Sequence, residues 1–454
     1  MSLKRALSLT DATSLLFSSM VGSGIFLTTG FVLKNTANPY FVLIAWFLGG
    51  FFALIGAYTY SYSAKLFPFA GGDYVYLREA YSPLIAFMSG WTSLVANFSA
   101  SISVLGITFS IYFLNVFSDF PKFELFRFSA LGLTWTLGTK QFLGIVVITF
   151  FTVINYFGVK KAVRLQNVFT FSKVGGLLLL LFAGLLFGKT TPVNFQSFPM
   201  LPNSSNDWTN LFLGVIPVTF SYLGWNMVTY VAEEIIEPEK NIRKSVALAC
   251  FFVTFLYLAI NTLFLLSAPV STLLEQKEMI GAVSVKFLFG EKASRLISIF
   301  VTWVVLGSLS AVVIGGSRIY FAMARDGLFF KSFANLHPQY HSPYVALFFQ
   351  AIYASLFMMV EEIESLLYMV TCSIMILSIL TAATPYIFHR RGMVPKVEIP
   401  FYPYSPFLFI AFNLFLVVFL FYTSTTNAIW GFAVTLSSIP VYYLFLNKKD
   451  LKKK

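Results

Sequence analysis

The sequence predicts an all-α polytopic membrane protein with 12 transmembrane helices. Apolar residues make up 57% of the 454 residues, charged residues make up only 11%, and the mean hydropathy is +0.78. This composition places most of the chain in lipid rather than around one aqueous core. The net charge of +12 comes from short basic clusters between apolar runs. Such clusters are typical of cytoplasmic loops beside anionic lipid, so a nucleic-acid partner is not expected.

Each of the apolar runs is long enough for a membrane helix, which needs about 20 mostly apolar residues. The runs begin near residues 12, 41, 83, 140, 165, 208, 243, 295, 343, 364, 404 and 427. With the N-terminus inside, the inner loops hold more than twice as many lysines and arginines as the outer loops. This bias predicts a plasma (inner) membrane protein with both termini cytoplasmic. The polar and apolar spacing of residues 268–295 predicts a short helix over the outer face.

Two of the apolar runs are interrupted near their middle. The first run contains Gly22, Ser23 and Gly24, and the sixth contains FSYLGW at residues 220–225. Small residues also allow helices to pack closely, but paired interruptions in two halves of a chain indicate a transporter's binding site. Unwinding frees amides that suit a carboxylate at one half-helix and carbonyls that suit an ammonium at the other. Together these groups match an amino acid backbone.

Four separated stretches, in order, resemble one family. They are VGSGIF (21–26), FPFAGGDYVYLREAYSPLIAFMSGW (67–91), FSYLGWNMVTYVAEEIIEPEKNIRKS (220–245) and GGSRIYFAMARDGLFFKSFANLHPQYHSP (315–343). The chain resembles the amino acid, polyamine and organocation (APC) transporter superfamily, and within it the L-type and related bacterial amino acid permeases. The resemblance implies a leucine-transporter-like fold of five plus five inverted helices with two more at the C-terminus. It also implies alternating access around a site at mid-membrane.

This fold divides the chain into five parts. The expected parts are a cytoplasmic N-terminus (1–11), a first inverted repeat with spans 1–5 (12–188), a second inverted repeat with spans 6–10 (208–389), spans 11 and 12 (404–447), and a basic cytoplasmic tail (448–454).

The resemblance also implies a substrate site at the two interruptions. The amides of Ser23 and Gly24 would bind the substrate carboxylate, and the carbonyls of Met20, Phe220 and Leu223 would meet its ammonium. Phe220 would also cover the substrate as a thin gate, and Leu223, often small or polar in relatives, would narrow the pocket. A side chain at Gly24 is expected to crowd the carboxylate while leaving the protein folded. The substrate-binding set is Met20, Val21, Gly22, Ser23, Gly24, Ile25, Phe220, Ser221, Tyr222, Leu223 and Gly224.

Lys173 lies inside the fifth apolar run. A charged lysine at the centre of a membrane helix costs about 2.5–3.5 kcal/mol, which marks it as a functional candidate. The plain alternative is a lysine that extends to the cytoplasmic interface. The resemblance favours function: the lysine ammonium stands where sodium sits in sodium-coupled relatives and bridges spans one and eight, with Ser308 as its partner and Ser310 as the alternative. This predicts transport without sodium and leaves exchange and proton symport open.

Five charged residues end the sixth and eighth spans and are expected at the cytoplasmic mouth. They are Glu233, Glu234, Arg318, Arg325 and Asp326. Ion pairs among them would form a cytoplasmic gate, and solvation at the interface is the plain alternative.

The central parts of spans one, three, six, eight and ten contain no carboxylate, so a small to medium neutral amino acid fits best. Carbonyls and aromatic faces also bind cations, so a proton-coupled cationic amino acid or polyamine transporter remains an alternative. A sensor built on the same fold is another. The three histidines lack ligand spacing, so no enzyme, metal or cofactor is expected. Residues 116–139 contain no cysteine, which predicts no disulfide-linked heavy chain.

Overall fold

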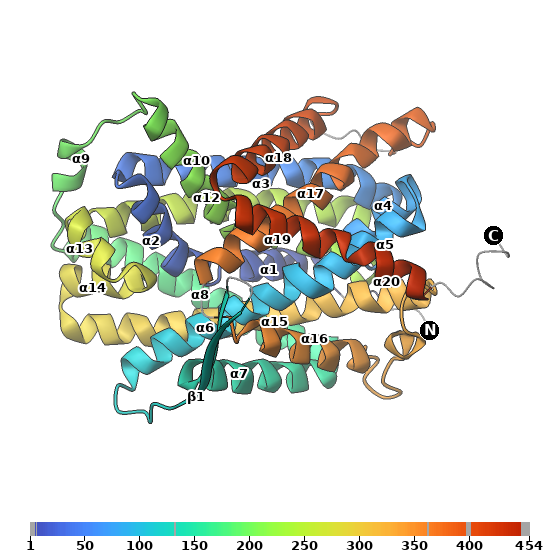
Figure 1. Ribbon diagram of the computed structural model, residues 1–454, viewed down its shortest axis with the longest axis horizontal. Coiled ribbons are helices and arrows are strands. Elements are labelled where there is room, and N and C mark those ends of the chain that lie inside the picture. Colours follow the sequence, from blue (N-terminus) through green and yellow to red (C-terminus); the bar gives the residue numbers. More distant parts are fainter. Residues whose placement is uncertain (1–4, 6, 131–132, 361–362, 396–400, 446–454) are drawn as a thin grey trace.

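The computed structural model describes residues 5, 7–130, 133–360, 363–395 and 401–445. Most of these residues lie in helices that run along the longest axis of the molecule (Figure 1). The first span is broken into α1 (Leu9–Met20) and α2 (Gly24–Thr36), and the sixth into α10 (Ser205–Ser221) and α11 (Met227–Tyr230).

The remaining elements follow in chain order. They are α3 (Pro39–Leu66), α4 (Asp73–Ala80), α5 (Pro83–Thr92), the π-helix η1 (Ser93–Phe98), α6 (Ser99–Val116), β1 (Glu124–Ala130), β2 (Leu133–Gly138), α7 (Thr139–Tyr156), α8 (Val159–Phe187), α9 (Val193–Ser197), η2 (Ala232–Glu234), α12 (Pro238–Leu265), α13 (Val270–Glu275), η3 (Lys277–Met279), α14 (Ile280–Phe289), α15 (Glu291–Arg325), η4 (Lys331–Ala334), α16 (Tyr344–Phe357), α17 (Ile363–Arg390), α18 (Tyr404–Thr423), α19 (Thr425–Leu436) and α20 (Ser438–Phe445).

The structure confirms an all-α, multi-pass membrane protein. In the described part of the chain, nine helical segments are long and apolar enough to cross a membrane, and α16 is a shorter apolar helix. The broken α10 and α11, and the shorter α16, α19 and α20, fall below that length individually. The count of 12 spans therefore stays a prediction, and the tail at 448–454 lies outside the described residues.

Both broken spans begin with the same local device. Ser8 precedes α1, its hydroxyl accepts a hydrogen bond from the Asp11 amide, and the Asp11 carboxylate accepts one from the Ser8 amide. Ser204 and Asp207 form the same reciprocal pair before α10. Such a capping box satisfies amides that a helix start leaves unpaired. The two broken spans are thus alike at their starts as well as at their breaks.

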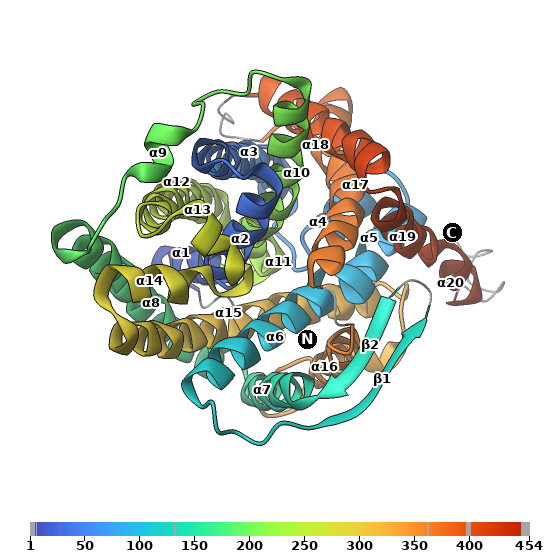
Figure 2. The same cartoon turned by 60° about the vertical axis from the view of Figure 1, so that its left-hand side comes forward.

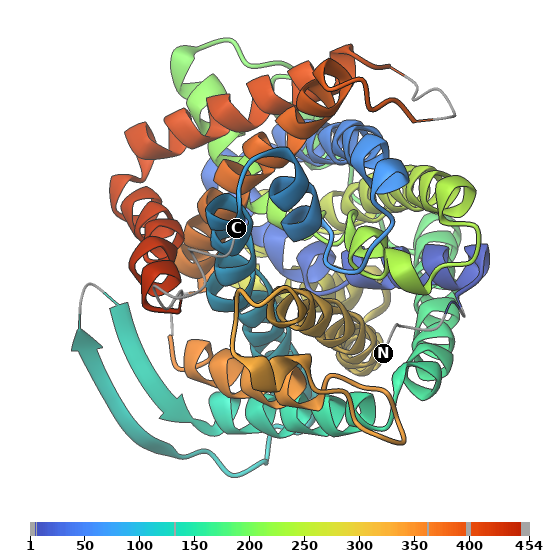
Figure 3. The same cartoon turned by 90° about the vertical axis from the view of Figure 1, so that its right-hand side faces the viewer.

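The broken spans lie in the middle of the bundle. α1 packs against α8, α12 and α15, and α2 packs against α10. Turning the molecule shows α1, α2 and α11 among the longer helices, with α18 and α19 on one side (Figures 2 and 3). α17 connects α18 and α19 to the rest of the bundle, because it packs against both of them and also against α3 and α4. Cys250 and Cys372 are buried and form no disulfide with each other.

A β-hairpin follows the third span and was not expected from the sequence. Strands β1 and β2 pair antiparallel, and the amide of Thr136 donates a hydrogen bond to the carbonyl of Met359 at 2.7 Å. The hairpin lies outside α6, α7 and α16 (Figure 2). Between spans seven and eight, the short helices α13 and α14 replace the single short helix expected there, and α14 packs on α2 and α15.

Candidate functional site

The first span unwinds over residues 21–23. The Val21 amide still donates to the Phe17 carbonyl at 2.8 Å, and α2 then starts at Gly24. In the described part of the chain, the amides of Ser23 and Gly24 donate to no backbone carbonyl. The first amides of a helix lack intrahelical partners and carry the positive end of its dipole. This break therefore offers two donors to an anion.

The sixth span unwinds over residues 222–226. Gly224 has φ of +98°, and a Cβ there would lie 2.7 Å from the Ser19 hydroxyl oxygen. Glycine is required at this position for two reasons: the left-handed backbone conformation and the close approach of α1. Pro217 inside α10 also removes one backbone donor from the turn before the break.

Side-chain hydrogen bonds join the two breaks. Ser19 donates to the Gly224 carbonyl at 3.1 Å, and Ser221 donates to the Thr28 hydroxyl at 2.7 Å. The Tyr257 hydroxyl lies between the carbonyls of Met20, at 2.7 Å, and Ser221, at 3.3 Å. A carbonyl oxygen has two lone pairs, so Met20 can accept from Tyr257 and still meet a substrate ammonium.

A cavity of about 110 Å³ lies between the two breaks. Nine of the predicted substrate residues line it: Met20, Gly22, Ser23, Gly24, Phe220, Ser221, Tyr222, Leu223 and Gly224. Val21 and Ile25 do not line the cavity. Ile25 is fully buried in the core, and the Val21 carbonyl accepts a hydrogen bond from Ser308 at 2.8 Å.

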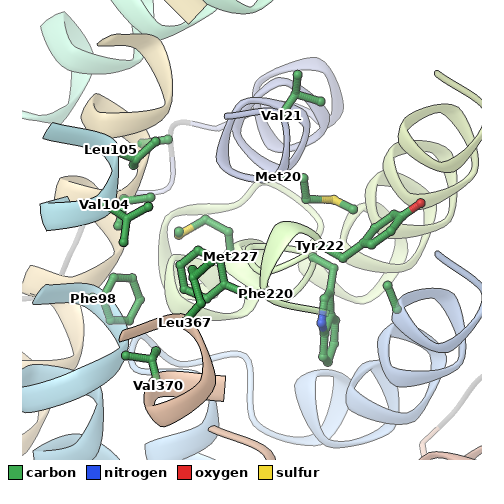
Figure 4. Close-up of a cluster of buried hydrophobic side chains, with 14 of the residues drawn as sticks. Met20, Val21, Phe98, Val104, Leu105, Phe220, Tyr222, Met227, Leu367 and Val370 are labelled. Atoms are coloured by element: carbon green, nitrogen blue, oxygen red, sulfur yellow. The ribbon is translucent and has the colours of Figure 1, made fainter. Parts of the chain in front are cut away.

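Apolar side chains surround Phe220 in this cavity. Figure 4 shows Phe220 and Met227 from the second broken span together with Phe98 and Leu105 from the third span. Phe98 ends the π-helix η1, which also places Asn97 on the cavity wall. π-helical turns often occur at functional sites. Sequence reasoning did not predict this π-helix.

Lys173 is fully buried and contacts both the first and the eighth spans. Its Nζ lies 2.7 Å from the Ser308 hydroxyl, 3.0 Å from the Val21 carbonyl, and 2.9 and 3.2 Å from the hydroxyl and carbonyl of Ser18. An ammonium has three donors, and these oxygens occupy all of them. Ser310 takes no part, and its hydroxyl is buried without a partner among the residues that the structure describes. A Cβ at Gly307 would lie 2.6 Å from Cβ of Phe169 and 2.8 Å from Cε of Lys173, so glycine at this position lets α15 pack closely on α8.

The predicted gate residues form ion pairs. Arg318 Nε lies 3.3 Å from Glu234 Oε1, with 4% and 2% of the two side chains exposed. Arg325 lies 3.3 Å from Glu233 at a more exposed position. Asp326 joins neither pair.

Asp326 instead pairs with α4. It forms an ion pair with Arg78 and accepts a hydrogen bond from the Tyr74 hydroxyl at 2.8 Å. Sequence reasoning missed Arg78, because nothing in the local pattern links residues so far apart.

The N-terminal segment lies beside the gate residues. The Leu7 amide donates a hydrogen bond to the Glu234 carbonyl, and the Ile236 amide donates one to the Leu7 carbonyl, both at 2.9 Å.

Sequence reasoning also missed Asp73, which lines the cavity from the first residue of α4. The search for carboxylates covered only the central parts of the spans, and Asp73 follows the second span. Two glycines with positive φ, Gly71 and Gly72, precede it. The GGD sequence directly after an apolar run was the signal for a tight turn toward the bundle.

Comparison with known proteins decides the family. A family model described as amino acid permease matches residues 7–445. The chain belongs to the amino acid permease family of the APC superfamily. This permease is therefore an amino acid transporter of the membrane rather than an enzyme.

Several characterised transporters are similar to this permease along most of its length. The serine/threonine exchanger SteT of Bacillus subtilis is 27% identical over 451 residues, which cover 98% of both chains. The human large neutral amino acids transporter small subunit 2 is 26% identical over 457 residues, covering 97% of this chain and 80% of its own. The mouse Asc-type amino acid transporter 1 is 25% identical over 460 residues, covering 97% and 81%.

Replacing Gly24 with valine is expected to abolish amino acid uptake and also to lower the melting temperature. A Cβ at Gly24 would lie 2.6 Å from both the Cβ and the hydroxyl oxygen of Ser221. The added side chain therefore pushes the two broken spans apart, and overpacking of this kind costs about 1–3 kcal/mol. The sequence-based expectation of an undisturbed fold does not take this contact into account.

Gly175→Val is the matched control, because a Cβ at Gly175 meets nothing within 4 Å. Uptake into proteoliposomes and thermal unfolding in detergent would be measured for both variants. Normal uptake by Gly24→Val would contradict the importance of this contact and of the site beside it.

Proposed function

We propose that this permease is a sodium-independent exchanger of small to medium neutral L-amino acids that works by alternating access. The position of Lys173 carries the proposal. Its Nζ donates hydrogen bonds to the Ser18 and Val21 carbonyls and to the Ser308 hydroxyl. These are the kind of oxygens that a sodium ion would coordinate between spans one and eight. Because these oxygens already bind a cation that belongs to the chain, no sodium ion is needed to hold the two spans together.

The substrate site follows from the two breaks. We place the substrate carboxylate on the amides of Ser23 and Gly24, at the positive end of α2. The carbonyls of Met20, Phe220 and Leu223 then face its ammonium, and Phe220 covers it. The Phe220 carbonyl already accepts from the Leu223 amide at 2.9 Å, so it offers only its second lone pair.

The size of the cavity supports a small to medium side chain. The backbone and the side chain of the substrate must both fit into its volume of about 110 Å³. Leu223, Phe220 and Met227 line this space. A single water needs about 10–15 Å³ measured in this way, so the space equals several water molecules. The related proteins named for serine, threonine and neutral amino acids support the same substrate class.

The proposal includes the full architecture expected from the sequence. We assign residues 12–188 and 208–389 to two inverted repeats, 404–447 to two further spans, and both termini to the cytoplasm. The matching capping boxes and breaks of the first and sixth spans support the repeat. The lack of cysteine in residues 116–139 supports a transporter without a disulfide-linked heavy chain.

Counterflow into proteoliposomes tests this function. Radiolabelled serine, alanine and leucine are supplied outside liposomes that contain the purified protein, with or without unlabelled amino acid inside, in sodium-free buffer. We expect uptake only into liposomes that hold internal amino acid, with no change when sodium is added. Uptake into empty liposomes driven by a pH gradient would instead identify a proton symporter. Binding without any uptake would identify a sensor.

A further inference from the structure

The cavity is lined by one acidic residue to which the proposed transport function assigns no role. Asp73 begins α4, in the connection between α3 and α5, and lines the same cavity as Gly24 and Phe220. Gly71 and Gly72 bring it there, since both have positive φ and Gly72 lies against Tyr230. A carboxyl group thus faces the space in which an amino acid would bind.

Hydrogen bonds connect Asp73 to the second broken span. The Tyr230 hydroxyl donates to Oδ2 of Asp73 at 3.3 Å, and the Asn226 side chain donates to the Tyr230 hydroxyl at 2.9 Å. Asn226 lies in the unwound segment and also lines the cavity. The other carboxyl oxygen, Oδ1, is buried and has no hydrogen-bond partner in the described part of the chain. The group therefore has room for one more proton donor or one bound proton.

Among the described residues, no cation forms an ion pair with this carboxyl. In the part of the chain that the structure describes, the titratable groups that face it are tyrosines: Tyr60 from α3, Tyr76 from α4 and Tyr230 from α11. Burial away from water raises the pKa of Asp73 to about 7, although the hydrogen bond from Tyr230 acts in the opposite direction. A buried carboxylate without a partner is costly, and a bound proton removes that cost.

We propose that Asp73 is a proton-binding site of the cavity, and that amino acid exchange is fastest when this carboxyl is protonated. The proposal rests on the exchange function given above. An ionised Asp73 would repel the substrate carboxylate and would have to be enclosed without a counter-ion whenever the cavity closes around Asn226 and Tyr230. Protonation removes both obstacles, and the neutral carboxyl can donate a hydrogen bond through Oδ1.

The first test is the pH dependence of exchange. Serine exchange is measured in sodium-free proteoliposomes with the same pH on both sides, from about pH 5 to about pH 9. For the wild type we expect the rate to fall by about tenfold or more as the pH rises through about 7. The exchange rate of Asp73→Asn should be about the same at every pH in this range, whatever its absolute value. The exchange rate of Asp73→Glu should again fall as the pH rises. A fall of equal size in Asp73→Asn, or a flat wild-type profile, would overturn the proposal.

The second test does not depend on transport. Because the folded protein raises the pKa of Asp73 above that of the unfolded chain, the folded state binds the proton more tightly, and stability from this group is lost as the pH rises toward about 7. The melting temperature in detergent of Asp73→Asn, relative to wild type, should therefore rise between about pH 4 and about pH 7 and then stay constant. A constant difference across the whole range would overturn the proton site.

These two measurements separate the two proposals. Melting behaviour as expected, in a protein that exchanges no amino acid at any pH, would support the proton site and reject exchange as the function. Inhibition of serine exchange by lysine or putrescine in the wild type but not in Asp73→Asn would assign the carboxylate to a ligand ammonium. That result would overturn the proton assignment.

Discussion

Lys173→Ala is expected to lower amino acid exchange by more than about tenfold while the protein remains in the membrane. The substitution removes the buried donor of the Ser18 carbonyl and of the Ser18 and Ser308 hydroxyls, while the Val21 carbonyl keeps only its hydrogen bond from Ser308. Each unsatisfied buried group costs about 1–3 kcal/mol, and each 1.4 kcal/mol corresponds to a factor of about ten. Spans one and eight would no longer be held in register around the substrate site. Exchange in proteoliposomes, normalised to the amount of reconstituted protein, measures the effect.

Three further variants make this experiment specific. Lys173→Met keeps the length and apolar character of the side chain but removes the donors, so it should behave like Lys173→Ala. Lys189→Ala removes an exposed lysine beyond the end of α8 and should leave exchange unchanged. Lys65→Ala, in the last turn of α3, should also have a mild effect. Equal, mild losses in all four variants would make Lys173 an ordinary membrane-interface lysine.

Arg318→Met is expected to lower the stability of the folded protein by about 3–5 kcal/mol. Its partner Glu234 is 2% exposed, so the substitution leaves an uncompensated buried carboxylate. The double variant Arg318→Met and Glu234→Gln removes both charges and should recover most of the loss. Thermal unfolding in detergent measures the effect of each variant.

The exposed ion pair of Lys240 with Glu237 provides the control. The two charged atoms lie 3.3 Å apart, as in the buried pair, but 62% and 63% of the side chains are exposed. Such pairs contribute about 0–1 kcal/mol, so Lys240→Met should change the melting temperature little. A loss as large as that of Arg318→Met, or a double variant no more stable than the single one, would contradict the role of burial.

The features that could be predicted from the sequence are those that contrast with an apolar background. Gly22, Ser23 and Gly24 stand out inside a run of apolar residues, and so does Lys173, because both glycine breaks and charges are costly in membrane helices. The choice between Ser308 and Ser310 could not be made in this way. Residues two apart on a helix point in different directions, and which one faces Lys173 depends on how α15 is rotated in the bundle.

Other parts of the site depend on contacts between distant segments. Asp73 and Tyr230 are 157 residues apart, and Arg78 and Asp326 are 248 residues apart. No local period or composition relates the two members of either pair. The hairpin of β1 and β2 was missed for a similar reason, since its docking through Thr136 depends on the end of α16. Val21 illustrates the same limit on a small scale, because its carbonyl faces Lys173 instead of the cavity.

The attachment of the Lys173 ammonium to α8 has an electrical consequence. The membrane potential does work on a charge only when that charge moves between the two sides, at about 2.3 kcal/mol per charge per 100 mV. A dissociable ion at this position would be released on the far side and would carry current. In the exchange cycle proposed above, a charge on Lys173 would return to its starting point after each turn, so this position would contribute no net current, and a zwitterionic substrate would add none. We therefore expect the proposed exchange of one neutral amino acid for another to be electrically silent.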